Sequence, residues 1–293
     1  PKGSVSFSQE DNKININSGD FNMVLPCVDA FDFPEITRND LTPALEFSQK
    51  KFKEMIKQTI FARAEDSTSR PQLTGVLLEY KNQVLNVVAL DGFRIAWRLE
   101  EIDQELASED FKLIVPGNTL SEISRIFSDE EDSTFKIDAG GNKVEFVTEN
   151  IIISSRILNG AFIDYEKVVV TDSNTTINIS TDAFQSAVER ANILAREGNK
   201  NNLIKFEITP GIIEIQAETE IGSISDKLSC DTQGEDLVIA FNASFLIDAL
   251  RTVASPDIEL QFSGSQGPCI IRPQGTENHV NFILPVKLRS EEF

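Results

Sequence analysis

Residues 85–99 read LNVVALDGFRIAWRL, two apolar-rich runs joined by Asp91-Gly92. An Asp-Gly pair between strand-forming segments is a strong hairpin signal, because both central residues of a type I′ turn need positive φ. We therefore predict a β-hairpin with Asp91 and Gly92 as its central residues. By itself this stretch indicates a hairpin and nothing more.

The hairpin lies inside a longer order of elements. Upstream, Phe52, Met55 and Ile56 recur at helical spacing, and we expect this helix to begin with Thr42 as its cap and Pro43 in its first turn. A second helix is predicted to open at Pro116-Gly117-Asn118-Thr119. Alternating or apolar runs predict strands at 76–80, 84–90, 93–99, 111–115, 135–137, 143–147 and 151–157.

The same order returns later in the chain. Helices are predicted at 181–196 and from Asn242 onward, and strands at 203–209, 212–218, 223–230, 237–241, 257–262, 269–272 and 280–288. Repetition at this scale is informative about the fold. It predicts an α+β protein with two similar units, around 42–160 and 175–288, each with two helices packed on one face of an antiparallel sheet.

Residues 1–37 read as strands and turns without a helix, and they hold too few apolar residues for a core. We expect them to be the end of a domain whose beginning is missing. The sequence begins at Pro1 rather than Met, so we expect a longer or processed protein.

Composition limits the classes of function. The net charge of −20 argues against a tight, enveloping nucleic-acid binder, although one local basic face would still permit contact with DNA. Three separated cysteines and a lone histidine, His279, argue against disulfide frameworks, metal sites and histidine-based catalysis, and no cofactor is predicted. No apolar run is long enough to cross a membrane and no signal segment is apparent, so a cytoplasmic location is expected.

Several motifs in order resemble a known family. They are Arg70-Pro71, Gly75-Val76-Leu77, Ala89-Leu90-Asp91-Gly92-Phe93-Arg94-Ile95-Ala96, Ser155-Arg156-Ile157, Asp164-Tyr165, Ala240-Phe241-Asn242-Ala243-Ser244-Phe245-Leu246 and Leu284-Pro285-Val286-Lys287-Leu288. Together they resemble the β subunit of DNA polymerase III, the β sliding clamp. The resemblance implies the DNA-clamp fold, with a remnant of the first domain at 1–38, the second domain at 42–165 and the third at 172–288.

The resemblance also implies a function. Such clamps are non-catalytic processivity factors of DNA replication: a homodimeric ring encircles duplex DNA without reading its sequence. They tether polymerase, clamp loader and repair proteins through short peptides. Three positions depart from the family pattern, namely Phe93 where His is usual, Ile163 where Pro is usual and Phe245 where Tyr is usual.

Two sets of site residues follow from the resemblance. The DNA-facing candidates are cations on the first helix of each repeat: Lys50, Lys53, Lys57, Arg190 and Arg196. The candidates for a partner-peptide pocket are Leu73, Leu90, Gly92, Phe93, Arg94, Ile95, Ile163, Lys167, Val168, Asn242, Phe245, Phe282, Leu284, Pro285, Val286, Lys287 and Leu288. An apolar cleft at a domain junction is a favoured place for a ligand.

Simpler interpretations stay open. The five helix cations fit an ordinary solvent-exposed helix face as well as they fit a DNA-facing one. Leu73, Ile95 and Leu284 also fit ordinary core packing. Two other functions are also considered. One is an enzyme that uses carboxylates such as Asp91 and Asp164, and the other is a divergent clamp paralogue that serves as an interaction scaffold without closing a ring.

Overall fold

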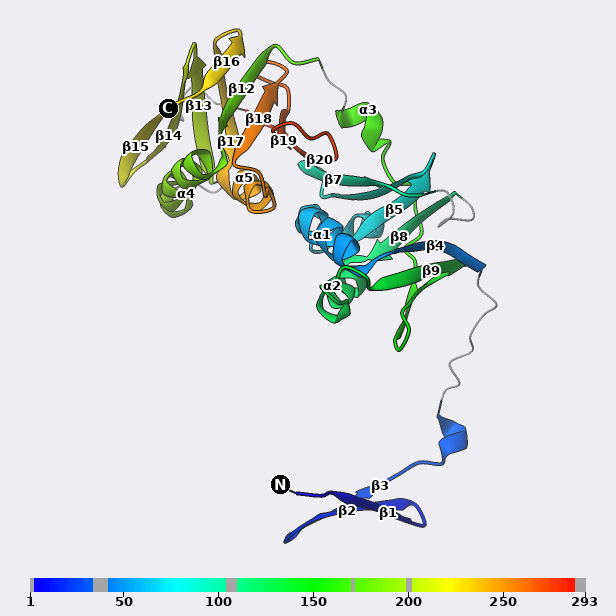
Figure 1. Cartoon of the computed structure of the whole chain (residues 1–293). Coiled ribbons are helices and arrows are strands. Elements are labelled where there is room, and N and C mark those ends of the chain that lie inside the picture. The colour runs from blue at the N-terminus through cyan, green and yellow to red at the C-terminus, as the bar shows by residue number, and fades with distance from the viewer. Residues whose placement is uncertain (1–2, 34–41, 104–109, 170–171, 199–201, 288–293) are drawn as a thin grey trace. The chain divides into compact units, whose positions relative to one another are not determined.

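The computed structural model describes residues 3–33, 42–103, 110–169, 172–198 and 202–287. Contacts within the chain separate residues 1–41 from residues 42–293, and each unit is treated by itself (Figure 1). The first unit is a three-stranded antiparallel sheet followed by a short 3-10 helix: β1 (Ser6–Glu10), β2 (Lys13–Ser18), β3 (Phe21–Pro26) and η1 (Ala30–Asp32).

The first unit buries almost nothing. Ser18 is the one buried residue among those described in it, while Phe7 and Phe31 are 66% and 97% exposed. The described part of residues 1–41 therefore contains strands without a hydrophobic core. This agrees with the expectation that it has too few apolar residues to form one.

Residues 42–293 begin with the first repeat. Its strands and α-helices are β4 (Thr42–Ser48), α1 (Gln49–Thr59), β5 (Gly75–Lys81), β6 (Val84–Leu90), β7 (Arg94–Glu101), β8 (Phe111–Pro116), α2 (Gly117–Ile126), β9 (Thr134–Gly140), β10 (Lys143–Val147) and β11 (Ile152–Arg156). Two 3-10 turns, η2 (Ile60–Ala62) and η3 (Pro71–Thr74), connect α1 to β5. Helix α3 (Tyr165–Val169) leads to the second repeat.

The second repeat has the same kind of order. Its elements are β12 (Thr175–Ser180), α4 (Thr181–Gly198), β13 (Leu203–Thr209), β14 (Ile212–Thr219), β15 (Gly222–Ser229), β16 (Asp231–Gly234), β17 (Leu237–Asn242), α5 (Ala243–Leu250), β18 (Asp257–Phe262), β19 (Cys269–Pro273) and β20 (His279–Ile283). The paired helices α1 and α2, and likewise α4 and α5, pack beside each other (Figure 1). The predicted α+β class with repeated units is confirmed.

The start of the first helix was predicted wrongly. Residues 42–48 form strand β4, which pairs antiparallel with β9, and α1 begins at Gln49 with the Ser48 side chain as its cap. Leu45 and Phe47 alternate inward with 1% and 6% exposure, which is the period of a strand rather than a helix. Strand β12, which likewise precedes α4, was not predicted, although α4 begins at Thr181 as expected.

The turn at 91–94 also differs from the prediction. Only Gly92 has positive φ (102°), whereas Asp91 does not. The Asp91 Oδ1 atom accepts hydrogen bonds from the amides of Phe93 and Arg94 at 2.9 and 3.1 Å, which places Asp91 before the turn. Gly92 and Phe93 are therefore the central residues, an order that fits a II′ rather than a I′ turn.

One nine-stranded sheet runs through both repeats. Its order is β16-β12-β18-β19-β20-β7-β6-β5-β8. The two repeats meet where β20 pairs antiparallel with β7, from His279 opposite Arg98 to Ile283 opposite Arg94. Two four-stranded sheets, β11-β10-β9-β4 and β15-β14-β13-β17, complete the unit. We call the β7–β20 pairing, with the side chains beside it, the seam.

Helix α3 is anchored to the first repeat by a buried tyrosine. The Tyr165 hydroxyl donates to Glu79 Oε2 at 2.5 Å, and the Tyr165 ring packs edge-on against Trp97. Burial alone would raise the pKa of Glu79, but hydrogen bonds from Lys112 and Tyr165 outweigh it and lower that pKa. The segment that connects the repeats therefore begins at a residue, Tyr165, that is held by a hydrogen bond and by ring packing.

Candidate functional site

An apolar cluster forms across the seam. It contains Leu73, Leu90, Ile95 and Phe282 of the predicted pocket, each about 5–6% exposed, and Val168 packs against it. Phe282 lies opposite Ile95 in the strand register. These side chains are buried against one another, so they form the floor beneath a surface site.

Above this floor, three segments from both repeats converge. They are the turn 91–94, helix α5 and the segment 284–287 that follows β20. The Leu284 amide donates to the Phe93 carbonyl at 2.9 Å, and the Phe93 and Phe245 rings stack with centroids 6.3 Å apart. Asn242 caps α5 by accepting from the Ser244 amide at 2.9 Å.

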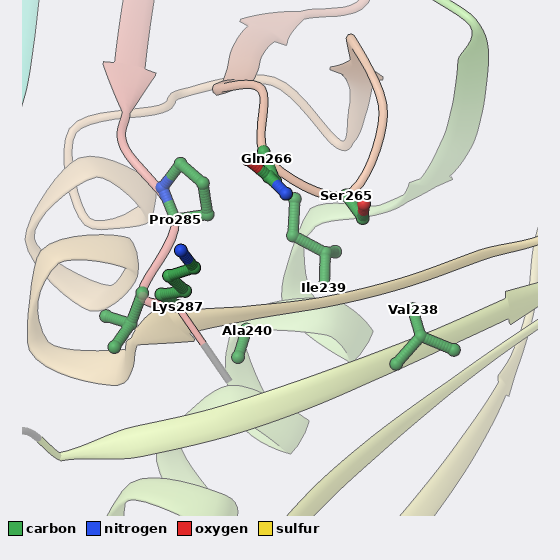
Figure 2. Close-up of a pocket in the computed structure, with 8 residues that line it drawn as sticks. Val238, Ile239, Ala240, Ser265, Gln266, Pro285 and Lys287 are labelled. Carbon is green, nitrogen blue, oxygen red and sulfur yellow. The ribbon is translucent and has the colours of Figure 1, made fainter. Parts of the chain in front are cut away.

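A cavity of about 330 Å³ opens on one side of segment 284–287 (Figure 2). Pro285, Val286 and Lys287 line it and belong to the predicted pocket; the other lining residues are Val238, Ile239, Ala240, Ser265 and Gln266. Sequence reasoning missed these five. The loop at 263–268 reads as a simple turn, and no local signal indicates that it approaches segment 284–287.

The remaining predicted pocket residues lie in or just before α3, in the turn 91–94, or outside the described residues. Ile163 is 44% exposed, and Lys167, within α3, forms an ion pair at 2.7 Å with Asp164, the residue before that helix. Gly92 lies in the turn, where a Cβ would come 3.8 Å from Arg70. Leu288 lies outside the described residues.

On the helix side of the seam, His279 is buried in a polar network. It is 3% exposed, and its Nε2 lies 3.2 Å from Asn281 Nδ2 and 3.4 Å from Thr252 Oγ1. Burial and the nearby Arg98 guanidinium lower the pKa of His279 to about 4, against a hydrogen bond with the Gln58 backbone that raises it. Arg98 itself donates to Gln58 Oε1 at 2.9 Å.

We expect this histidine to make the protein sensitive to acid. Because the unfolded chain takes up a proton near pH 6.5 and the folded one only near pH 4, unfolding is favoured as the pH falls through that window. The loss at pH 4 reaches about 3 kcal/mol for a shift of this size. Urea unfolding of the wild type and His279→Gln from pH 7.5 to 4 measures it.

The glutamine variant is expected to lose less stability over this pH range. Since His279 is the only histidine, its imidazole NMR signals give the folded-state pKa directly. A measured pKa near 6.5, or equal pH dependence of the two proteins, would contradict the assignment.

The predicted DNA-facing cations fall into three groups, of which the third is Lys53 alone. Lys50 and Arg190 are paired with Glu131 and Asp226, respectively. Lys57 and Arg196 are exposed on α1 and α4, with no ion pair to a described residue.

Lys53 corrects the expectation of an exposed lysine face. It is 7% exposed, and its Nζ lies 2.6 Å from Asp129 and 3.1 Å from the Phe127 carbonyl, so it ties α1 to the end of α2. The stem of a lysine is long enough to be buried while its ammonium group reaches the surface.

A second apolar surface lies between α4 and the β14–β15 hairpin. Ile193 and Ile221 are 70% and 66% exposed beside a hollow of about 470 Å³ that Arg190, Leu194 and Ile224 also line. The adjacent β15 is one of the two edge strands of its sheet. We call this surface the α4–β15 patch; it was not predicted from the sequence.

Two further findings concern the described residues alone. No helix among them is long and apolar enough to cross a membrane. No group of three or more His, Cys, Asp or Glu side chains within the described ranges is arranged to hold a metal ion.

Family models match most of the chain. The model of the DNA polymerase III beta subunit central domain matches residues 46–164, and that of its C-terminal domain matches residues 166–287. The chain is 31% identical to the Bacillus subtilis beta sliding clamp over 98% of its own length and 76% of that protein. It is 33% identical to beta sliding clamps of Staphylococcus aureus, of which it spans 66%.

Solved structures agree with the sequence comparisons. The crystal structure of the B. subtilis DNA polymerase sliding clamp is similar with a TM-score of 0.92 at 31% identity, covering 99% of this chain and 76% of that one. A putative DNA polymerase III beta subunit from Eubacterium rectale gives 0.89 at 30% identity, over 97% and 76%. On the order of its elements, its repeats and these matches, the chain belongs to the family of DNA polymerase III β subunits, the β sliding clamps.

Proposed function

We propose that this chain serves DNA replication as a sliding clamp that encircles duplex DNA and tethers polymerase and other partners through a short-peptide groove. Besides family membership, one observation carries the proposal: side chains of both repeats converge at the turn 91–94, α5 and segment 284–287. Such a junction, with an apolar floor and few polar groups, is a favoured place for a peptide. A cytoplasmic location is part of the proposal.

The proposed DNA contact rests on Lys57 and Arg196, with Lys50 and Arg190 as partly neutralised neighbours. A sliding contact gains from few and weak phosphate interactions, because tight ones would hold the ring at one position. The acidic remainder of a chain with net charge −20 would repel DNA from other surfaces.

The α4–β15 patch is the surface that we propose for ring closure in a homodimer. An exposed strand edge beside exposed isoleucines offers both main-chain hydrogen bonds and apolar area to a second subunit. The partner surface is not part of this proposal, since the chain spans about three quarters of the B. subtilis relative.

Neither carboxylate considered for catalysis is free for it. Asp91 binds the turn amides and Arg94, and the hydrogen bond from Lys167 lowers the pKa of Asp164. We therefore propose a non-catalytic accessory subunit. The alternative of a scaffold without ring closure is separated by loading the full-length gene product with its clamp loader on nicked circular DNA: a ring is retained until the DNA is linearised, whereas a scaffold is not retained at all.

The groove makes a direct prediction. A peptide of the Gln-x-x-Leu-Phe type is expected to bind with roughly micromolar affinity, about −8 kcal/mol. Deleting Val286–Phe293 is expected to abolish binding, because it removes one wall of the cavity. Fluorescence anisotropy with a labelled peptide measures this, and a peptide with Ala-Ala in place of Leu-Phe is the control. Binding that survives the deletion would show that the groove is misplaced.

A further inference from the structure

Arg94 belongs to the turn 91–94, one of the three segments that form the proposed groove, but its hydrogen-bond donors are used within the protein. Its side chain is 11% exposed, and it donates to Asp91 Oδ2 at 3.0 Å, Asp248 Oδ2 at 2.7 Å and the Phe61 carbonyl at 2.9 Å. The guanidinium carbon also lies 4.5 Å from the centroid of the Phe245 ring. Little of Arg94 remains to bind a ligand carboxylate.

These contacts join three elements from the two repeats. Asp91 belongs to the β6–β7 turn, Phe61 to η2 at the end of α1, and Asp248 to α5 of the second repeat. Asp91 also holds the amide of Phe93. Through one guanidinium group, the turn that carries Phe93 is therefore fixed against the helix that carries Phe245.

The result is an aromatic pair built from both repeats. The Phe93 and Phe245 rings are 6.3 Å apart with 25° between their planes, and Phe93 is 62% exposed. Neither side chain has a hydrogen-bonding group. A ligand side chain that contacts this pair therefore does so by apolar or aromatic packing.

We propose that Arg94 and Asp248 are positioning residues of the peptide groove: they hold the Phe93–Phe245 pair, and the pair contacts an apolar anchor of the peptide. This inference rests on the proposed peptide-binding function. Arg94, predicted to contact the peptide, is assigned instead to supporting the residues that contact it. Asp248, which none of the sequence motifs contains, is added in the same supporting role. A planar guanidinium is needed because its donors diverge in fixed directions, which a lysine cannot reproduce.

Peptide affinity of the whole chain tests the role, measured by anisotropy with a labelled Gln-x-x-Leu-Phe peptide. Asp248→Asn removes the negative charge that strengthens the hydrogen bond from Arg94, and it is expected to weaken binding about tenfold. Arg94→Lys keeps the charge and is expected to weaken it at least as much. Asp248→Glu is expected to restore binding to within about threefold of the wild type. Asp182→Asn, an exposed carboxylate on α4, is the matched control and is expected to change nothing.

A double-mutant cycle with Phe93→Ala distinguishes positioning from general damage. If Asp248 acts through the aromatic pair, Asp248→Asn has little further effect once Phe93 is alanine. Full additivity of the two changes, or normal binding by Asp248→Asn, would overturn the positioning role. Failure of the wild type to bind any such peptide would instead overturn the groove itself, and the positioning role with it.

Discussion

Ile193→Asp is expected to convert the full-length gene product from a dimer to a monomer. Ile193 is 70% exposed in the α4–β15 patch, where the apolar surface of a second subunit would cover it. In a closed interface the new carboxylate would be buried without a partner. Removing this charge from water costs several kcal/mol of binding free energy, which is enough to dissociate most interfaces. Size-exclusion chromatography with light scattering measures the change in mass.

The matched control is Ile126→Asp, on α2. Ile126 is also a helix isoleucine, 45% exposed, but it lies away from the α4–β15 patch. This variant is expected to keep the oligomeric state of the wild type. A dimeric Ile193→Asp protein would contradict our assignment of the ring interface, whereas a monomeric wild type would favour the scaffold alternative.

Phe52→Ala is expected to reduce the free energy of unfolding by about 3–5 kcal/mol. The Phe52 side chain is fully buried on α1, with ring centroids 4.9 Å from Phe135, 6.0 Å from Phe146 and 6.3 Å from Phe127. Its removal leaves a cavity among rings from β9, β10 and the residue that follows α2, and these rings cannot all move inward. Urea denaturation followed by circular dichroism gives the difference.

Phe93→Ala is the comparison for this prediction. The same atoms are removed from a side chain that is 62% exposed and has one aromatic neighbour, so the expected loss is about 1 kcal/mol or less. Equal losses of unfolding free energy in the two variants would contradict the prediction that packing around Phe52 contributes more to stability than packing around Phe93.

The sequence predicted best where periodicity and turn chemistry agree. Strand β13 ends at Thr209 and β14 begins at Ile212, as Pro210-Gly211 indicates, and Gly211 has the positive φ (80°) that this turn needs. Asn242 was expected to open α5, and its side chain caps that helix. In each case the signal is local and has a direct physical cause.

Prediction failed where two local signals compete. Thr42 and Pro43 resemble a helix start, but Leu45 and Phe47 alternate, and pairing with β9 decides in favour of a strand. At the hairpin, Asp91 can be a turn residue or can accept the turn amides with its side chain; it does the second. Tertiary contacts resolve such choices, and a single sequence does not contain them.

The candidate site was less predictable than the fold. Motifs that resemble the family indicated the turn 91–94, Phe245 and segment 284–287, but they gave no reason to include Asp248 or Val238. Their roles depend on which strands and helices meet, not on neighbours in the sequence. Lys53 is a similar case. Its position on the helix predicted an exposed side chain, but the chain at the end of α2 covers it.

The seam also limits how such a chain can vary in length during evolution. Along β20, His279 and Asn281 lie on the helix side, while Val280 and Phe282 enter the apolar cluster on the other side. Because side chains alternate, inserting one residue into β20 would exchange these two sets and place polar groups in the cluster. Insertions and deletions are therefore expected in flanking turns such as 274–278, while the length of β20 stays constant among functional relatives.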